Sequence, residues 1–395
     1  AGAAQAATKS ISGLTFESPA DPVWQESKID GGLLYEWKST NADNGRQATA
    51  MLVVAASPFF KGDIDKALVQ LMDSAGLLVG AEPLQSHKGT TTDGLPMRWA
   101  LRAGSINDAP SSPAVVVVVA MQRPQGLASA FMILVNMDDP GRDKADAALD
   151  ALVASYDFGG GLRPALPTPV PGSQSFEGPY VYTVTSFAQN PMGGTSMQYN
   201  WRLRQFAPNG LYADRLPLAG ETLEAVCARL PDECGTYRID GDQVTFNEMK
   251  RFGMVETGYA KRMTKTARGF ALGGMPYEPA QGVPTPTLNG SWRHNYFVSG
   301  PNGSVTSIRQ IDFTPDGRYK RTGFVGATVD NPVAGISSTS SGTDPEQTGR
   351  YEIDGLTLKL ISDAGETDMM SLVATDPADL SFLFIDSDAY SLVTQ

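Results

Sequence analysis

Hydrophobic residues follow two different periodicities in the first 158 residues of this chain. Four short stretches are rich in β-branched residues and bounded by turn formers, which is typical of buried strands; they cover residues 46–56, 96–103, 113–121 and 127–137. Two others repeat apolar residues every three or four positions, as amphipathic helices do, at 63–76 and 141–158. The order of strands, helix, strands, helix predicts an α/β domain over residues 14–158, after a flexible tail at 1–13.

From residue 176 onward apolar and polar residues alternate, and three landmarks occur twice in the same order. The pairs are FEGPYVYTV (176–184) with LNGSWRHNY (288–296), FAPNGLY (206–212) with FTPDGRY (313–319), and GTYRIDGDQVTF (235–246) with GRYEIDGLTLKL (349–360). Asn-Gly and Asp-Gly favour hairpin turns, and a sheet hides its edges by closing into a barrel. We therefore expect two antiparallel β-barrels, at 176–272 and 288–395.

Two proline- and glycine-rich stretches flank the first expected barrel, at 159–175 and 273–287. Proline lacks the N–H that a strand or helix needs and favours extended, semi-rigid chain. We predict that both stretches are linkers between domains.

Two parts of the chain resemble known families. TFESPADPVW (15–24), the order of strands and helices, and the ending ASYDF resemble the Mog1/PsbP-like α/β/α sandwich over residues 14–158. The G-x-[WY] openings at 178–180 and 290–292, with the later F-x-P-[DN]-G-x-Y and G-x-Y-x-I-[DN]-G turns, resemble lipocalin-like barrels, although the first repeat has Tyr180 in place of tryptophan. The expected fold class is multidomain α+β, an N-terminal α/β/α sandwich followed by two lipocalin-like β-barrels.

The lipocalin-like resemblance implies a cup for a small, mostly apolar ligand. Alternate residues of a strand share a face, so Trp292, His294 and Tyr296 are candidates for the wall of the second cup. Tyr180 and Tyr182 occupy the matching positions of the first repeat. For His294, a structural, hydrogen-bonded role is the alternative.

Two arginines also align between the repeats, each four residues before the repeated phenylalanine: Arg202 and Arg309. A buried arginine must be paired or stacked on a ring. We predict that each lies under its barrel in a cation–π contact with the G-x-[WY] aromatic residue, with ligand binding as the alternative.

The first repeat also carries an insert, GETLEAVCARLPDEC (220–234), which predicts a short helix. Its cysteines, Cys227 and Cys234, are close enough to form a disulfide in an oxidising compartment.

The first residues, AGAAQAATKS, resemble what remains after signal-peptide cleavage, so a periplasmic or secreted location is expected. The longest apolar run, at 114–121, is much shorter than the ~20 residues of a membrane span.

Charge and histidine content argue against several classes of function. A net charge of -12 opposes binding to nucleic acid. The two histidines, His87 and His294, fall in different expected domains, so neither a His-based metal site nor a Ser-His-Asp triad is expected, and we predict no metal and no cofactor. The carboxylates between Asp344 and Asp388 lack the spacing of a calcium loop and predict a solvated acidic face.

These features predict an extracytoplasmic binding protein rather than an enzyme. Its partner would be a small apolar molecule or another envelope or extracellular protein, and the adaptor role common in Mog1/PsbP-like domains favours contact with protein. One alternative is an enzyme whose site in the second barrel uses His294, Tyr296 and a carboxylate. Another is a structural subunit of a surface assembly, with the proline-rich stretches as spacers.

Overall fold

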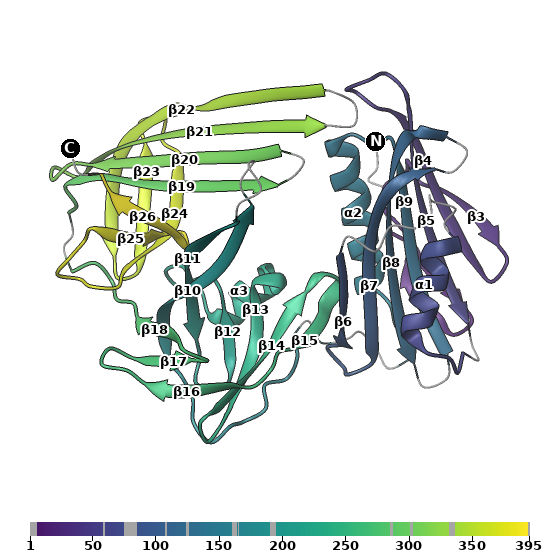
Figure 1. The fold of residues 1–395 in the computed structure, drawn as a ribbon, viewed down its shortest axis with the longest axis horizontal. Helices are drawn as coiled ribbons and strands as arrows, with labels where there is room; N and C mark the ends of the chain where they lie inside the picture. The colour runs from purple at the N-terminus through teal and green to yellow at the C-terminus, as the bar shows by residue number, and fades with distance from the viewer. Residues whose placement is uncertain are drawn as a thin grey trace. The chain divides into compact units, whose positions relative to one another are not determined.

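The computed structural model describes residues 6–57, 60–74, 85–106, 109–123, 126–159, 164, 166–189, 195–284, 287–300, 303–331 and 336–393. The chain divides into two units (Figure 1). The first contains residues 1–168 and 247–258, and the second contains residues 169–246 and 259–395.

The first unit is built on an antiparallel sheet with the strand order β15-β6-β7-β8-β9-β5-β4-β3. The strands are β3 (Gln25–Ile29), β4 (Gly32–Thr40), β5 (Gln47–Ser57), β6 (Gln85–Thr91), β7 (Pro96–Ile106), β8 (Ala109–Arg123), β9 (Gly126–Val135) and β15 (Met254–Thr257). The four strands expected from the apolar pattern correspond to β5, β7, β8 and β9, so these predictions are confirmed.

Both expected helices are also present, as α1 (Ile64–Ser74) and α2 (Asp139–Ala154). The side chain of Asp63 accepts a hydrogen bond from Asp65 N at 2.8 Å, which caps the start of α1. Along β8, Val116 belongs to the apolar cluster that contains α1, whereas Val117 belongs to the cluster that contains α2. The two helices therefore cover opposite faces of the sheet, which explains why this strand is apolar without alternation.

Besides residues 159–168 of the expected linker, two segments outside the predicted boundaries of 14–158 belong to the first unit. Residues Thr8–Ile11 form β1 and pair with β2 (Leu14–Glu17), so the prediction of a flexible tail over 1–13 is wrong for this strand. Residues 247–258 contribute β15, whose Met254 and Val255 pair with β6. That second segment lies within the repeated region of the sequence, so the alternating pattern assigned it to a barrel.

The second unit contains two closed, eight-stranded antiparallel barrels. The first barrel has the order β13-β12-β11-β10-β18-β17-β16-β14 and is closed by pairing of β13 with β14. Its strands are β10 (Gly178–Gln189), β11 (Thr195–Phe206), β12 (Leu211–Ala213), β13 (Cys234–Asp240), β14 (Gln243–Lys250), β16 (Lys261–Lys265), β17 (Phe270–Leu272) and β18 (Met275–Pro279).

The second barrel closes in chain order from β19 to β26, and β19 to β22 are its long strands (Figure 1). The strands are β19 (Gly290–Gly300), β20 (Gly303–Phe313), β21 (Arg318–Asn331), β22 (Ile336–Asp354), β23 (Thr357–Ser362), β24 (Thr367–Ala374), β25 (Phe382–Ile385) and β26 (Asp388–Leu392). The prediction that the chain builds a β-barrel twice is confirmed.

The repeated landmarks occupy equivalent places in the two barrels. The opening hairpins have the same register, with Gly178 opposite Phe206 and Gly290 opposite Phe313. The tyrosine of each G-x-Y-x-I-[DN]-G turn accepts a hydrogen bond from the main chain just before the opening strand. Tyr237 Oη accepts from Phe176 N at 2.8 Å, and Tyr351 Oη accepts from Leu288 N at 2.7 Å.

The proline-rich stretch at 273–287 is not a linker throughout, because Met275–Pro279 forms β18 of the first barrel. Pro276 pairs only with β17, and Pro279 pairs only with β10. Each proline therefore lies where the strand pairs on one side only. The N–H that proline lacks is not needed on the other side, so both prolines fit in the sheet. In the stretch at 159–175, Ser173 N donates to Ile239 O at 2.6 Å, so its end is docked on the first barrel.

Candidate functional site

The second barrel contains a cavity of about 450 Å³ lined by side chains from β20, β21, β22, β24, β25 and β26. Its apolar wall consists of Ile311, Met370, Ile385 and Tyr390. Its charged wall consists of Arg309, Arg321, Asp344, Glu346, Glu366 and Asp386. The cavity is therefore amphipathic, with an apolar side continuous with the barrel core and a charged side.

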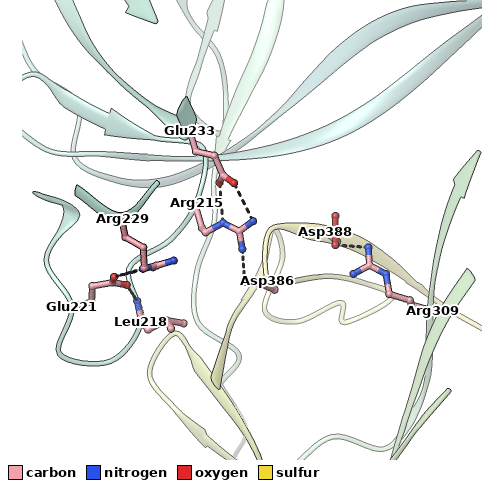
Figure 2. Close-up of polar contacts among 8 residues, drawn as sticks. All are labelled: Arg215, Leu218, Glu221, Arg229, Glu233, Arg309, Asp386 and Asp388. Atoms are coloured by element: carbon pink, nitrogen blue, oxygen red, sulfur yellow. Dashed lines mark hydrogen bonds and ion pairs between the residues drawn. The ribbon is translucent and has the colours of Figure 1, made fainter. Parts of the chain in front are cut away.

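Both arginines of the cavity are held by carboxylates. Arg309 Nη2 lies 2.7 Å from Asp388 Oδ2 (Figure 2). Arg321 Nη1 lies 2.9 Å from Asp368 Oδ2. These pairs are partly exposed, so each fixes the position of a guanidinium group more than it stabilises the barrel.

Asp386 belongs to a strained turn beside the cavity. It forms, with Ser387, the two-residue connection between β25 and β26, and the φ angles of the two residues are 50° and 70°. The first barrel builds the equivalent turn, between β17 and β18, from Gly273 and Gly274. Glycine adopts positive φ without a steric penalty, whereas serine does not, and strain of this kind is often retained at binding sites.

An arginine from the first barrel contacts this turn. Arg215 Nη1 lies 2.9 Å from Asp386 Oδ1, and its other nitrogens form two hydrogen bonds with Glu233, at 2.9 and 3.2 Å (Figure 2). Burial raises the pKa of the Asp386 carboxyl, and the nearby Arg215 only partly offsets this. The hydrogen bond to Glu233 is the main cause that raises the pKa of Arg215.

The insert of the first barrel positions Glu233. It forms α3 (Leu223–Arg229), as predicted, and a short 3-10 turn that ends at Glu233. The predicted disulfide between Cys227 and Cys234 is present, with Cα atoms 5.6 Å apart. It ties the helix to the start of β13, so the carboxylate beside Cys234 is fixed relative to the barrel.

The centre of the first barrel is occupied by a buried arginine, and a smaller hollow of about 280 Å³ remains against Tyr182, Leu272 and Tyr277 of the same interior cluster. The guanidinium of Arg204 lies 4.2 Å from the ring centre of Tyr212, 5.0 Å from that of Phe246 and 5.1 Å from that of Tyr182. Arg204 Nε and Nη2 contact the two carboxylate oxygens of Asp214, at 2.5 and 2.9 Å. Although burial opposes the charged form, Asp214 raises the pKa of Arg204. We call this arginine with its rings and carboxylate the Arg204 cluster.

The predicted buried arginines are wrong in position. Arg202 is exposed, and the buried cation of the first barrel is Arg204, two residues further along the same strand. Arg309 is also exposed, at 44% of its side chain, and pairs with Asp388 instead of lying under the barrel. In the second barrel Ile311 stands opposite Trp292, where the first barrel has Arg204 opposite Tyr180.

The predicted cup-wall residues of the second barrel lie at different depths. Trp292 is buried in the core, and its Nε1 donates to Leu380 O at 2.8 Å. His294 is half-buried, with Nδ1 2.9 Å from Ala389 O and its ring 5.5 Å from that of Tyr390. Tyr296 is 49% exposed.

The two tyrosines named for the first barrel belong to its aromatic interior. Tyr180 packs on Phe206 and Phe270, with ring centres 5.7 and 5.1 Å apart. Tyr182 belongs to the Arg204 cluster, stacks on Tyr277 at 4.7 Å, and lines the hollow of about 280 Å³ in the first barrel.

The acidic cavity residues were not identified individually by sequence reasoning. Asp344, Glu346, Glu366 and Asp386 belong to the segment between residues 344 and 388 that predicted a solvated acidic face. The signal was the excess of carboxylates, and the repeat could not place them because the first barrel lacks this excess. Within the described ranges, no three His, Cys, Asp or Glu side chains are arranged to hold a metal ion.

No protein-family model matches the chain, and no curated protein sequence matches it. Among the helices in the described part of the chain, none is long and apolar enough to cross a membrane.

Proposed function

We propose that this is an extracytoplasmic, non-enzymatic binding protein whose second barrel holds a small ligand. The observation that carries this proposal is the cavity of about 450 Å³, which opens among strands of a closed barrel. A volume of this order falls in the range of small-molecule sites, and eight-stranded barrels commonly hold one small ligand. The lipocalin-like motifs at 178–180 and 290–292 support the same role.

The strained turn at Asp386 and Ser387 adds support. The first barrel forms the matching turn from two glycines, so this fold can make the turn without backbone strain. The second barrel keeps two side chains there, and one of them lines the cavity. A residue retained at a conformational cost beside a cavity is consistent with recognition of a ligand.

The first barrel has a different role in this proposal. Its outward-facing Val181 and Leu203 pack in one cluster with Val373 and Phe384 of the second barrel. Arg215 adds an ion pair to Asp386. The first barrel therefore acts as a support that presents the second, while the first unit, by its Mog1/PsbP-like resemblance, contacts another envelope or extracellular protein.

The disulfide favours an oxidising, extracytoplasmic location. The enzymatic alternative gains no support from His294, because Nδ1 contacts the main-chain oxygen of Ala389. For that reason we assign binding and no catalytic step to the second barrel.

A pair of neighbouring methionines tests the proposal. Met370 lines the cavity, whereas Met369, on the opposite face of β24, is 41% exposed. We expect native mass spectrometry of the full chain, purified without denaturation, to show a retained small molecule. Met370→Trp should abolish retention by filling the cavity, and Met369→Trp should leave it unchanged. Retention that survives Met370→Trp would place the ligand elsewhere and contradict the proposal.

A further inference from the structure

Carboxylates outnumber cations in the wall of the cavity. Two arginines face four carboxylates, which leaves two net negative charges. Including the residues that form ion pairs with the wall leaves this net charge unchanged, because the two negative charges of Asp368 and Asp388 balance the two positive charges of Arg215 and Lys320. The cavity therefore attracts positive charge, and the net charge of -12 on the whole chain acts in the same direction.

Two of these carboxylates have no counter-ion among the described residues: Asp344 and Glu366. Asp344 pairs with Gly323 of the strand beside it. Its carboxylate reaches the neighbouring strand β21, where it lies in the space beside Gly323 that a Cβ at this position would enter. One carboxylate thus lies beside the backbone of β21, and the second, that of Glu366, lines the cavity just before the start of β24.

The wall also offers an unused neutral acceptor. Gln347 lines the cavity, and its Oε1 is buried without a hydrogen-bond donor in the part of the chain that the structure describes. A buried acceptor without a donor costs free energy, and a ligand that donates a hydrogen bond would recover it. This observation is independent of the charge count and favours a ligand that donates a hydrogen bond, as an ammonium or guanidinium group does.

The positive groups of the wall are already engaged. Arg309 and Arg321 each contact a carboxylate at 2.7 and 2.9 Å. An anionic ligand would have to compete with Asp388 and Asp368 for these guanidinium groups and would also meet two unpaired carboxylates. Beside these charged groups, Ile311, Met370 and Tyr390 give the cavity lining an apolar and aromatic surface.

We propose that the cavity of the second barrel binds a small organic cation, an ammonium or guanidinium ion with a short apolar or aromatic body. The cationic head lies between Asp344 and Glu366, and the body packs against Met370 and Tyr390. This proposal rests on the proposed function and names the chemical class of its ligand. It replaces the expectation of a mostly apolar ligand.

Three probes with the same aromatic body test the charge preference: 2-phenylethylammonium, neutral 2-phenylethanol and anionic 3-phenylpropanoate. Titrated into the full chain and followed by calorimetry, the ammonium ion should bind at least about tenfold more tightly than the other two. Raising the salt concentration should weaken its binding, because screening reduces attraction between exposed charges.

Single substitutions test the placement of the head group. Glu366→Gln and Asp344→Asn should each weaken binding of 2-phenylethylammonium by about two- to fivefold. Asp354→Asn removes the same charge from the far end of β22, where Asp354 pairs with Thr357, and should leave the affinity unchanged. Equal losses in all three variants would show only a general charge effect and would overturn the proposed placement.

The remaining outcomes separate this inference from the proposed function. If the alcohol or the carboxylate binds as tightly as the ammonium ion and Met370→Trp abolishes that binding, the cavity is a site but its ligand is not a cation. If no probe binds while the native protein retains a small molecule, the cation inference again fails and the binding function stands. If no probe binds and nothing is retained, both are overturned.

Discussion

The two barrels have the same framework and different interiors. Their opening hairpins share one register, and Tyr237 and Tyr351 receive equivalent main-chain hydrogen bonds. Inside the first barrel the Arg204 cluster occupies the centre and leaves a hollow of about 280 Å³. Inside the second barrel there is a cavity of about 450 Å³. The residues that close the barrel are therefore not the residues that decide how much of its interior is filled.

A few matched positions account for the difference. Where the first barrel has Arg204 the second has Ile311, and where the first has Phe246 the second has Leu360. Both replacements are smaller, and one of them, Ile311, lines the cavity. The charge is also inverted two residues beyond the repeated tyrosine, with Asp214 in the first barrel and Arg321 in the second. The acidic group of a buried pair is thus replaced by a basic group at the cavity wall.

The largest expected effect comes from removing the arginine at the centre of the first barrel. Arg204→Ala should destabilise the first barrel by about 3 to 5 kcal/mol, because it deletes the buried half of an ion pair and the packing of three rings. Arg309→Ala in the second barrel removes a partly exposed ion pair and should cost less than about 1 kcal/mol. Native-state hydrogen exchange on the full chain, resolved by peptide, measures each barrel separately.

Arg202→Ala is the control for Arg204→Ala, since the exposed Arg202 lies on the same strand. It should change stability by no more than about 0.5 kcal/mol. A larger loss from Arg202→Ala than from Arg204→Ala would return the structural role to the position predicted from the repeat.

That error shows how far the sequence could predict the site. Residues 202, 204 and 206 share a strand face, so parity alone allowed either arginine to be buried. The repeat favoured Arg202 because Arg309 aligns with it, whereas the true position, 204, aligns with Ile311. Alignment of repeats identifies what the two barrels share, and the buried arginine is where they differ.

The fold was easier to predict from the sequence than the site, because it depends on local patterns that repeat many times. Turns with Asn-Gly or Asp-Gly and alternating strands predicted both barrels, and the spacing of Cys227 and Cys234 predicted their disulfide. The pairing of β15 with β6 depends on contacts distant in sequence, which no local pattern of residues 247–258 encodes. Assignment of that segment to the first unit needed the structure.

A second way to test the comparison is to overfill both interiors with the same substitution. Ile239 and Ile311 are both buried, but only the second lines the cavity. Ile239→Phe should destabilise the first barrel by about 1 to 3 kcal/mol, since a packed core has no room for added atoms. Ile311→Phe should cost less than about 1 kcal/mol, because the cavity accepts the ring. Equal costs, measured by the same hydrogen-exchange method, would mean that the cavity is not available space.

The equivalent two-residue turns allow a reciprocal exchange. Ser387→Gly should stabilise the second barrel by about 1 kcal/mol, because glycine relieves the strain of a φ of 70°. Gly274→Ser should destabilise the first barrel by a similar amount, since φ is 87° there. Chemical denaturation with fluorescence and exchange read-outs reports both changes. If Ser387→Gly were destabilising, the serine side chain would have to make a contact that stabilises the barrel by more than the backbone strain costs.

The smallest expected effect concerns the ion pair that joins the two barrels. Arg215 and Asp386 have side chains that are 28% and 46% exposed, so solvent screens their attraction. A double-mutant cycle with Arg215→Ala and Asp386→Asn should give a coupling of about 0.5 kcal/mol, within the range for exposed pairs. Asp386→Asn alone should lower the stability only slightly, because burial already raises the pKa of this carboxyl and disfavours its charged form.

The same cycle, measured on binding of 2-phenylethylammonium, determines whether the first barrel influences the cavity. Arg215 holds Asp386 at the wall while Glu233 holds Arg215, so Arg215→Ala should let the turn move and reduce affinity even though the cavity keeps its full set of carboxylates. Arg229→Ala is a matched control, because it breaks an ion pair of the same insert, with Glu221, that does not reach the turn (Figure 2). Loss of affinity in Arg215→Ala alone would establish that the first barrel positions a wall of the cavity in the second. An unchanged affinity would restrict the role of Arg215 to holding the two barrels together.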